Sequence, residues 1–166
     1  MTSPIAPLAQ PHFTELHAVL DAVAREKRFL ALTQAPPLAE TIAFFQQNVD
    51  NDHPHFVALL DGAVVGWCDV LPVFGQAREH IGTLGIGLLP SARHLGLGRQ
   101  LMAAAIDKAW RKGLARIELT VRTDNPNART LYERLGFKHE GVQRQAFRVD
   151  GQFIDSHAMA LLRHAV

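Results

Sequence analysis

A short glycine-containing segment, Arg93–Arg99, has the composition of an anion-binding loop. Its sequence is Arg-His-Leu-Gly-Leu-Gly-Arg, and it lies between a predicted strand and a predicted helix. The first N–H groups of a helix have no partners within the helix, and the helix dipole favours negative charge at that end. The glycines let the backbone approach an anion closely, and Arg93, His94 and Arg99 add positive or titratable side chains. These residues predict a phosphate-binding loop, for which a plain strand-to-helix turn is the alternative.

A second segment whose residues could take part in binding or catalysis, Asn125–Phe137, follows about thirty residues later. Asn125 precedes Pro126, which is typical of a helix N-cap followed by proline at the first helical position. Tyr132, the only tyrosine of the chain, lies one helical turn after Ala128, so both residues can face one ligand. A phenol can give a proton to a leaving group. The alternative for Tyr132 is an aromatic ring packed in the core.

Taken together, the two segments resemble the signature of the GNAT superfamily of N-acetyltransferases. That family has Gln or Arg, two residues, Gly, one residue, and Gly or Ala, which Arg93 to Gly98 match. It then has Asn, two residues, Ala, two residues, Leu-Tyr, three residues and Gly-Phe, which Asn125 to Phe137 match at the same spacing. The resemblance covers Ile86 to Phe137, about a third of the chain. It implies an enzyme that transfers an acetyl group directly from acetyl-CoA to an amine.

The resemblance also implies where acetyl-CoA binds. Its pyrophosphate would lie on the amides of residues 94–99 beside Arg93, a set formed by His94, Leu95, Gly96, Leu97, Gly98 and Arg99. The pantetheine arm carries amides that pair with an exposed strand edge, for which Ile86, Gly87 and Leu88 are the candidates. Asn125, Ala128 and Tyr132 complete the expected contacts.

Glycines interrupt the predicted strand His80–Leu89 at Gly82, Gly85 and Gly87. Each weakens a strand unless a bulge or a close contact requires it. In the GNAT family this strand and the next one, here Arg116–Thr123, splay apart so that the thioester enters between them. We expect the glycines to permit a bulge at that point, and close backbone packing is the alternative.

Acyl transfer to an amine needs a neutral amine, donors toward the developing oxyanion, and a proton for the thiolate. The resemblance assigns the proton to Tyr132. Family members often carry a carboxylate base at positions that match Thr83 and Thr120, and threonine is not a base near neutral pH. Glu118 lies on the same strand face as Thr120, because alternate residues of a strand face one side. Glu118 is therefore the candidate base, acting through water, and the alternatives are a solvated or ion-paired surface glutamate and loss of the amine proton to bulk water.

The elements that position these residues follow from hydrophobic periodicity. It predicts a strand at Ile5–Pro7, helices over Phe13–Arg28 and Leu38–Val49, a hairpin of Phe56–Leu60 and Ala63–Leu71, a helix from near Gly98 to Gly113, a short helix from Asn125 to Gly136, and two long strands meeting at Asp150-Gly151. This order predicts an α+β (mixed α/β) fold. We expect a single GNAT-like domain over residues 1–166, with a central, mostly antiparallel twisted sheet and a βαβ acetyl-CoA-binding core flanked by helices.

Composition limits the class of acceptor and the cellular location that the sequence predicts. The 166 residues carry 17 Lys and Arg against 16 Asp and Glu, a balance that is not typical of nucleic-acid-binding proteins. The Arg144 to Met159 segment resembles the GNAT branch that acylates free amino acids and small amines, so we expect a small-molecule amine as acceptor.

The single cysteine excludes a disulfide framework, and the Asp50–His55 run lacks metal-site spacing, so no metal is expected. No signal-peptide or membrane-spanning pattern is found, which predicts a cytoplasmic protein.

Three other functions are compatible with parts of the sequence. A dinucleotide-binding oxidoreductase is suggested by Gly96-Leu97-Gly98 and Glu118, although Leu101 replaces the third glycine of that motif. A domain that binds acyl-CoA as a sensor without turnover, and an enzyme that acetylates protein N-termini or lysines, are the others. The two long terminal strands have edges that need covering, so we also expect a homodimer.

Overall fold

The computed structural model describes residues 3–164; residues 1, 2, 165 and 166, the ends of the predicted 1–166 domain, lie outside the described residues. Its elements are β1 (Ile5–Pro7), α1 (Phe13–Arg25), α2 (Leu38–Asp50), β2 (His55–Leu60), β3 (Ala63–Pro72), β4 (Ile81–Leu88), α3 (Leu97–Arg111), β5 (Arg116–Arg122), α4 (Pro126–Arg134), β6 (Lys138–Val149) and β7 (Gln152–Leu162). The predicted order is confirmed, with each boundary within one helical turn. Within residues 3–164, no helix is both long enough and apolar enough to cross a membrane.

The strands form one seven-stranded sheet in the order β1-β2-β3-β4-β5-β7-β6. Every neighbouring pair is antiparallel except β4 and β5, which α3 connects into the expected βαβ unit. The mostly antiparallel sheet with flanking helices is therefore confirmed. After β5 the chain continues through α4 to β6, but β6 pairs with β7 in antiparallel fashion and does not extend a parallel sheet, so the doubly wound dinucleotide-binding fold is excluded.

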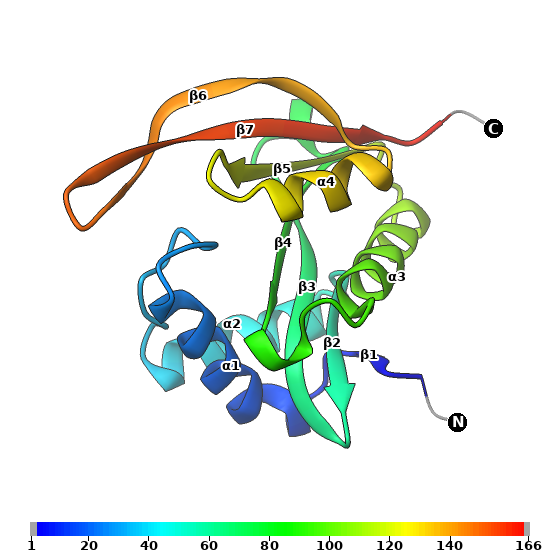
Figure 1. Cartoon of the computed structure of the whole chain (residues 1–166). Coiled ribbons are helices and arrows are strands. Elements are labelled where there is room, and N and C mark those ends of the chain that lie inside the picture. Colours follow the sequence, from blue (N-terminus) through cyan, green and yellow to red (C-terminus); the bar gives the residue numbers. More distant parts are fainter. Residues whose placement is uncertain (1–2, 165–166) are drawn as a thin grey trace.

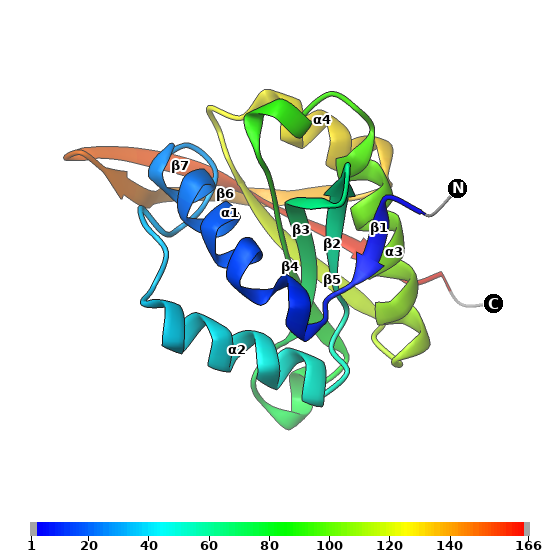
Figure 2. The same cartoon turned by 90° about the horizontal axis from the view of Figure 1, so that it is seen from below.

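Helices cover both faces of the sheet (Figures 1 and 2). On one face α3 buries Leu101, Met102 and Ala105 in a core that also includes residues of α4. On the other face α1 and α2 form a second core, to which Phe45 and Trp67 belong. The amphipathic patterns of the helices thus determine two separate hydrophobic layers, one on each side of a single sheet.

Two tight turns connect the hairpins as predicted. Asp61-Gly62 joins β2 to β3 with φ angles of 50° and 82°, and Asp150-Gly151 joins β6 to β7 with φ angles of 49° and 80°. Two consecutive positive φ angles are the requirement of the type I′ turn, which Asp-Gly satisfies at low cost.

The two parallel strands separate after a short paired stretch (Figure 1). β4 pairs with β5 only over Ile81–Thr83, opposite Arg116–Glu118. Beyond that point β4 continues along β3 to Leu88, whereas β5 continues along β7 to Arg122. The splay that the family resemblance implied is present.

The bulge expected at the β4 glycines is wrong. The pairing of β3 with β4 runs without a register shift from Gly66 opposite Leu88 to Pro72 opposite Gly82. A Cβ at Gly87 would lie 2.4 Å from the Trp67 ring, so this position accepts only glycine while the indole lies across it. Close packing therefore explains Gly87, although the neighbour is the Trp67 side chain and not the backbone that the alternative named.

Candidate active site

The separation of β5 leaves one edge of β4 without a strand partner. The Leu89 N–H donates to the Val65 carbonyl of β3, at 2.8 Å. Because backbone groups of alternate residues point to the same side, Gly87 also faces β3, whereas Ile86 and Leu88 face the gap. The Leu88 carbonyl accepts hydrogen bonds from Arg93, so the open edge offers the backbone groups of Ile86 and the Leu88 N–H to an amide-bearing arm, whereas the predicted contact with Gly87 is turned toward β3.

This open edge leads to a loop with unpaired backbone donors. The N-cap Gly96 of α3 is left-handed, with φ of 80°, and His94 also has a positive φ of 61°. Among the described residues, the N–H groups of residues 94–99 have no hydrogen-bond partner, and the first one that does is Gln100, which donates to Gly96 at 3.2 Å. Six consecutive free amides at the N-terminus of a 15-residue helix fit a pyrophosphate group.

The guanidinium of Arg93 is engaged away from these amides. It donates to the Leu88 carbonyl at 2.8 and 3.0 Å and to both carboxylate oxygens of Glu26, and it lies 4.6 Å from the centre of the Phe29 ring. Arg93 thus connects the end of β4 to the end of α1. In this structure Arg93 therefore holds the loop in position.

Helix α4 lies against the same loop. Asn125 is its N-cap, as predicted, and accepts a hydrogen bond from the Ala128 N–H at 3.3 Å. In the first turn of α3, a Cβ at Gly98 would lie 3.6 Å from Leu131 of α4 and 3.4 Å from Leu88 of β4. The two motif segments are therefore brought together at one end of the gap.

Tyr132 is buried on the α3 and α4 face of the sheet. Its ring centre lies 6.1 Å from that of Phe137, and Cys68 of β3 is close enough to affect its ionisation. Burial, with a smaller effect from the Cys68 thiol, raises the pKa of the phenol well above its usual value. Tyr132 therefore stays protonated at neutral pH, as a proton donor must. Since Cys68 is paired with Ile86, the ring lies close to the open edge of β4.

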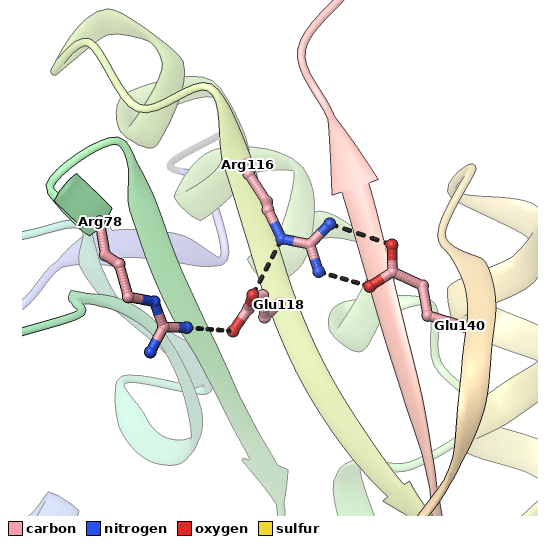
Figure 3. A network of polar contacts seen from close by, with 4 residues as sticks. All are labelled: Arg78, Arg116, Glu118 and Glu140. Atoms are coloured by element: carbon pink, nitrogen blue, oxygen red, sulfur yellow. Dashed lines mark hydrogen bonds and ion pairs between the residues drawn. The ribbon is translucent and has the colours of Figure 1, made fainter.

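Glu118 lies in a network of ion pairs (Figure 3). One carboxylate oxygen accepts a hydrogen bond from Arg116 at 2.9 Å, and the other lies 3.6 Å from the guanidinium of Arg78. Arg116 also binds both carboxylate oxygens of Glu140. Both carboxylate oxygens of Glu118 therefore face guanidinium groups, so its surroundings are those of the ion-paired alternative.

A cavity of about 240 Å³ lies on the opposite face of the sheet, among α1, α2, β2 and β3. Its walls are apolar side chains from α1, α2 and the segment between them, together with Trp67. Two polar residues, His55 and Asp69, also line it. Sequence reasoning missed both of these residues.

Asp69 and His55 have strongly perturbed ionisation. The Asp69 side chain is 13% exposed, and burial raises its pKa to about 7 although the Gly85 backbone N–H opposes the rise. Burial lowers the pKa of His55 to about 3, so this imidazole is neutral. The available signal was that Asp69 is the only charged residue in the apolar run Val64–Leu71.

The end of α1 is tied to both separated strands. Glu26 forms its ion pair with Arg93 after β4, and the Lys27 carbonyl accepts a hydrogen bond from Arg122, at the end of β5, at 2.7 Å. The rest of the Arg122 guanidinium binds Asp124. Two consecutive residues thus hold α1 across the open ends of the gap.

Comparisons with known proteins agree with this architecture. The profile of the Acetyltransferase (GNAT) family matches residues 16–137. The N-alpha-acetyltransferase RimI of Mycobacterium tuberculosis is 30% identical over 152 residues, which is 91% of each chain. The L-amino acid N-acetyltransferase AaaT of Escherichia coli is 31% identical over 64% of this chain and 67% of its own. The structure of yncA from Salmonella typhimurium with its cofactor acetyl-CoA superimposes with a TM-score of 0.92 at 18% identity, over 100% of this chain and 98% of that one.

Proposed function

The chain belongs to the GNAT family of acetyltransferases and is an N-acyltransferase, and we propose that it transfers the acetyl group of acetyl-CoA to the amine of a small molecule. The observation that carries the donor assignment is the open edge of β4 that leads to six free amides at residues 94–99. The open edge matches the amide-rich pantetheine arm of acetyl-CoA, and the free amides match its pyrophosphate.

Most of the predicted residues have a role in this proposal, whereas Glu118 is ion-paired, Gly87 faces β3 and Arg93 holds the loop in position. The amides of residues 94–99 hold the pyrophosphate, and the backbone groups of Ile86 together with the Leu88 N–H pair with the pantetheine arm. The thioester then lies where β4 and β5 converge. The amine attacks its carbonyl carbon, the C–S bond breaks, and Tyr132 gives a proton to the departing thiolate. Asn125 and Ala128 begin the helix that positions Tyr132.

The size of the acceptor is inferred from the cavity beside Asp69. The relatives differ in acceptor, since AaaT is an L-amino acid N-acetyltransferase and RimI an N-alpha-acetyltransferase. A cavity of about 240 Å³ has room for one small amine. The net charge of +1, without a long acidic or basic run, does not favour a charged macromolecule as acceptor.

The test is thiol release from acetyl-CoA with a panel of acceptors. The panel contains free amino acids, simple alkylamines, a peptide with a free N-terminus and a peptide with an internal lysine. We expect turnover on the amino acids or alkylamines. Turnover on the peptides alone would contradict the small-molecule acceptor and favour a protein acetyltransferase.

Location and assembly complete the proposal. A cytoplasmic location is consistent with the single cysteine, Cys68, which is buried and free. A homodimer would cover the outer edge of β6 in the long hairpin with β7. The pairing of β6 with β7 has two register shifts, which also protect an edge, so light scattering at tens of micromolar decides whether a partner is needed.

A further inference from the structure

Asp69 and Tyr132 lie on opposite faces of the sheet at almost the same place. Neighbouring residues of a strand point to opposite faces, so Cys68 faces Tyr132 whereas Asp69 faces the cavity beside α1 and α2. Asp69 is paired with Gly85 of β4, two residues beyond Thr83, where the pairing of β4 with β5 stops. Asp69 therefore lies beside the beginning of the gap, on the side away from the proton donor.

The cavity has apolar walls and one polar end. At that end the Nδ1 atom of His55 is 3.1 Å from the side-chain nitrogen of Asn48, an amide donor, which places the imidazole proton on Nε2. This Nε2 atom is buried, has no hydrogen-bond partner among the described residues, and lies 3.9 Å from an Asp69 oxygen. A buried donor without a partner is costly, so this polar end of the cavity is a candidate place for a polar ligand.

We propose that Asp69 is the base that takes the proton from the acceptor amine, and that the acceptor is a primary amine whose apolar substituent lies in this cavity. The proposal rests on the proposed small-amine acetyltransferase activity. The ammonium end of such a molecule donates a hydrogen bond to the Asp69 carboxylate. Its substituent contacts Leu16, Leu20, Phe44 and Trp67.

The protons balance with one acid and one base. The bound ammonium ion gives its first proton to the Asp69 carboxylate, and the neutral amine forms the C–N bond at the thioester carbonyl. When the C–S bond breaks, Tyr132 protonates the thiolate. The nitrogen then loses a second proton, which restores the tyrosine through solvent. Asp69 releases the first proton to water before the next turnover.

The surroundings of Asp69 suit this role. Burial holds its pKa near 7, within the range at which a general base is most effective at neutral pH. The titratable group that faces it is His55 of β2, which is neutral, and among the described residues the cavity walls from α1, α2 and β3 carry no other ionisable side chain. Turnover should therefore rise with pH as Asp69 ionises.

Asp69→Asn tests the assignment, because asparagine keeps the shape and removes the base. We expect kcat/KM to fall by roughly 10²- to 10⁴-fold, with loss of the acidic limb near pH 7 and unchanged acetyl-CoA affinity. Asp61→Asn, the same substitution in the exposed turn of the same hairpin, is the matched control and should behave as the parent. If the pH profile of kcat/KM for Asp69→Asn kept the height and the acidic limb of the parent profile, the proposal would be overturned.

A binding experiment tests the cavity without turnover. In a Trp110→Phe background Trp67 is the only tryptophan, and it lines the cavity. With CoA present, phenethylamine and leucinamide should change its fluorescence at concentrations about tenfold or more below those of ethanolamine and putrescine. Equal responses to the apolar and polar amines would contradict the acceptor class.

The two experiments also separate this inference from the proposed function. If the parent acetylates small amines and Asp69→Asn does so equally well, the base assignment fails and the proposed function stands. If the parent acetylates peptides alone, the proposed function fails, whatever the amines do to Trp67.

Discussion

The hydroxyl of Tyr132 is a single atom on a buried ring, so its removal separates chemistry from packing. In Tyr132→Phe the ring keeps its place beside Phe137 while the proton for the thiolate is lost. We expect kcat to fall by roughly 10²- to 10⁴-fold with little change in the dissociation constant of acetyl-CoA. Steady-state kinetics and calorimetry measure the two quantities. Unchanged kcat, or a parallel loss of acetyl-CoA binding, would contradict the assignment.

Sequence reasoning at the scale of single residues succeeded where a role depends on near neighbours. The N-cap role of Asn125 follows from its position before Pro126, and the structure confirms it. It was less informative for Glu118, which lies on the predicted strand face but binds Arg78, about forty residues away in the sequence. Ion pairs between distant segments depend on tertiary packing, which the pattern of one strand does not encode.

Asp69 was missed for a related reason. A lone aspartate in an apolar strand is conspicuous, but only the fold shows that its face of β3 lines a cavity and that His55 lies beside it. Burial then changes its chemistry, because the low-dielectric surroundings disfavour the carboxylate form. An ionisable residue inside an apolar strand should therefore be treated as a candidate site residue before the fold is known.

At the scale of elements, the two ends of α3 provide a matched test of the amide loop. Gly96 precedes the helix with φ of 80° and Gly113 follows it with φ of 93°, and a Cβ added at either glycine would have no neighbouring atom within 4 Å. Valine at either position strains the backbone by about 1–2 kcal/mol without a steric clash. Only Gly96→Val disturbs the free amides of residues 94–99.

We therefore expect both variants to lose similar unfolding free energy, and only Gly96→Val to bind acetyl-CoA more weakly, by tenfold or more. Urea unfolding and calorimetry measure the two effects. Equal acetyl-CoA affinity in Gly96→Val and Gly113→Val would show that the loop does not hold the pyrophosphate.

Periodicity and turn chemistry were sufficient to predict the helices and strands, because these signals are local. The Asp-Gly turns and the apolar stripe of α3 are examples. The separation of β4 from β5 came from the family resemblance, since no local signal marks where two distant strands stop pairing. The bulge at the β4 glycines was wrong because the position of Trp67 opposite Gly87 depends on the register of β3 with β4.

At the scale of the whole molecule, the gap between β4 and β5 connects two differently built faces. The face with α3 and α4 carries the free amides and Tyr132, whereas the face with α1 and α2 carries the cavity and Asp69. The contacts of Glu26 and Lys27 hold α1 to both separated strands. The acetyl donor and the amine can therefore approach one point from opposite sides of the sheet.

The buried Asp69 carboxyl also makes the stability of the whole chain depend on pH. Its pKa is raised from 3.8 to about 7 on folding, so between these values the folded state keeps a proton that the unfolded state has released. Raising the pH through this window therefore lowers the free energy of unfolding by at most about 1.4 kcal/mol for each pH unit. With respect to Asp69, the folded chain is most stable below the pKa that this carboxyl has in the unfolded chain. Asp69→Asn removes this dependence. Urea unfolding at pH 5 and pH 8 should show the variant gaining stability relative to the parent at the higher pH, and a difference that is the same at both values would show that Asp69 does not change its ionisation on folding.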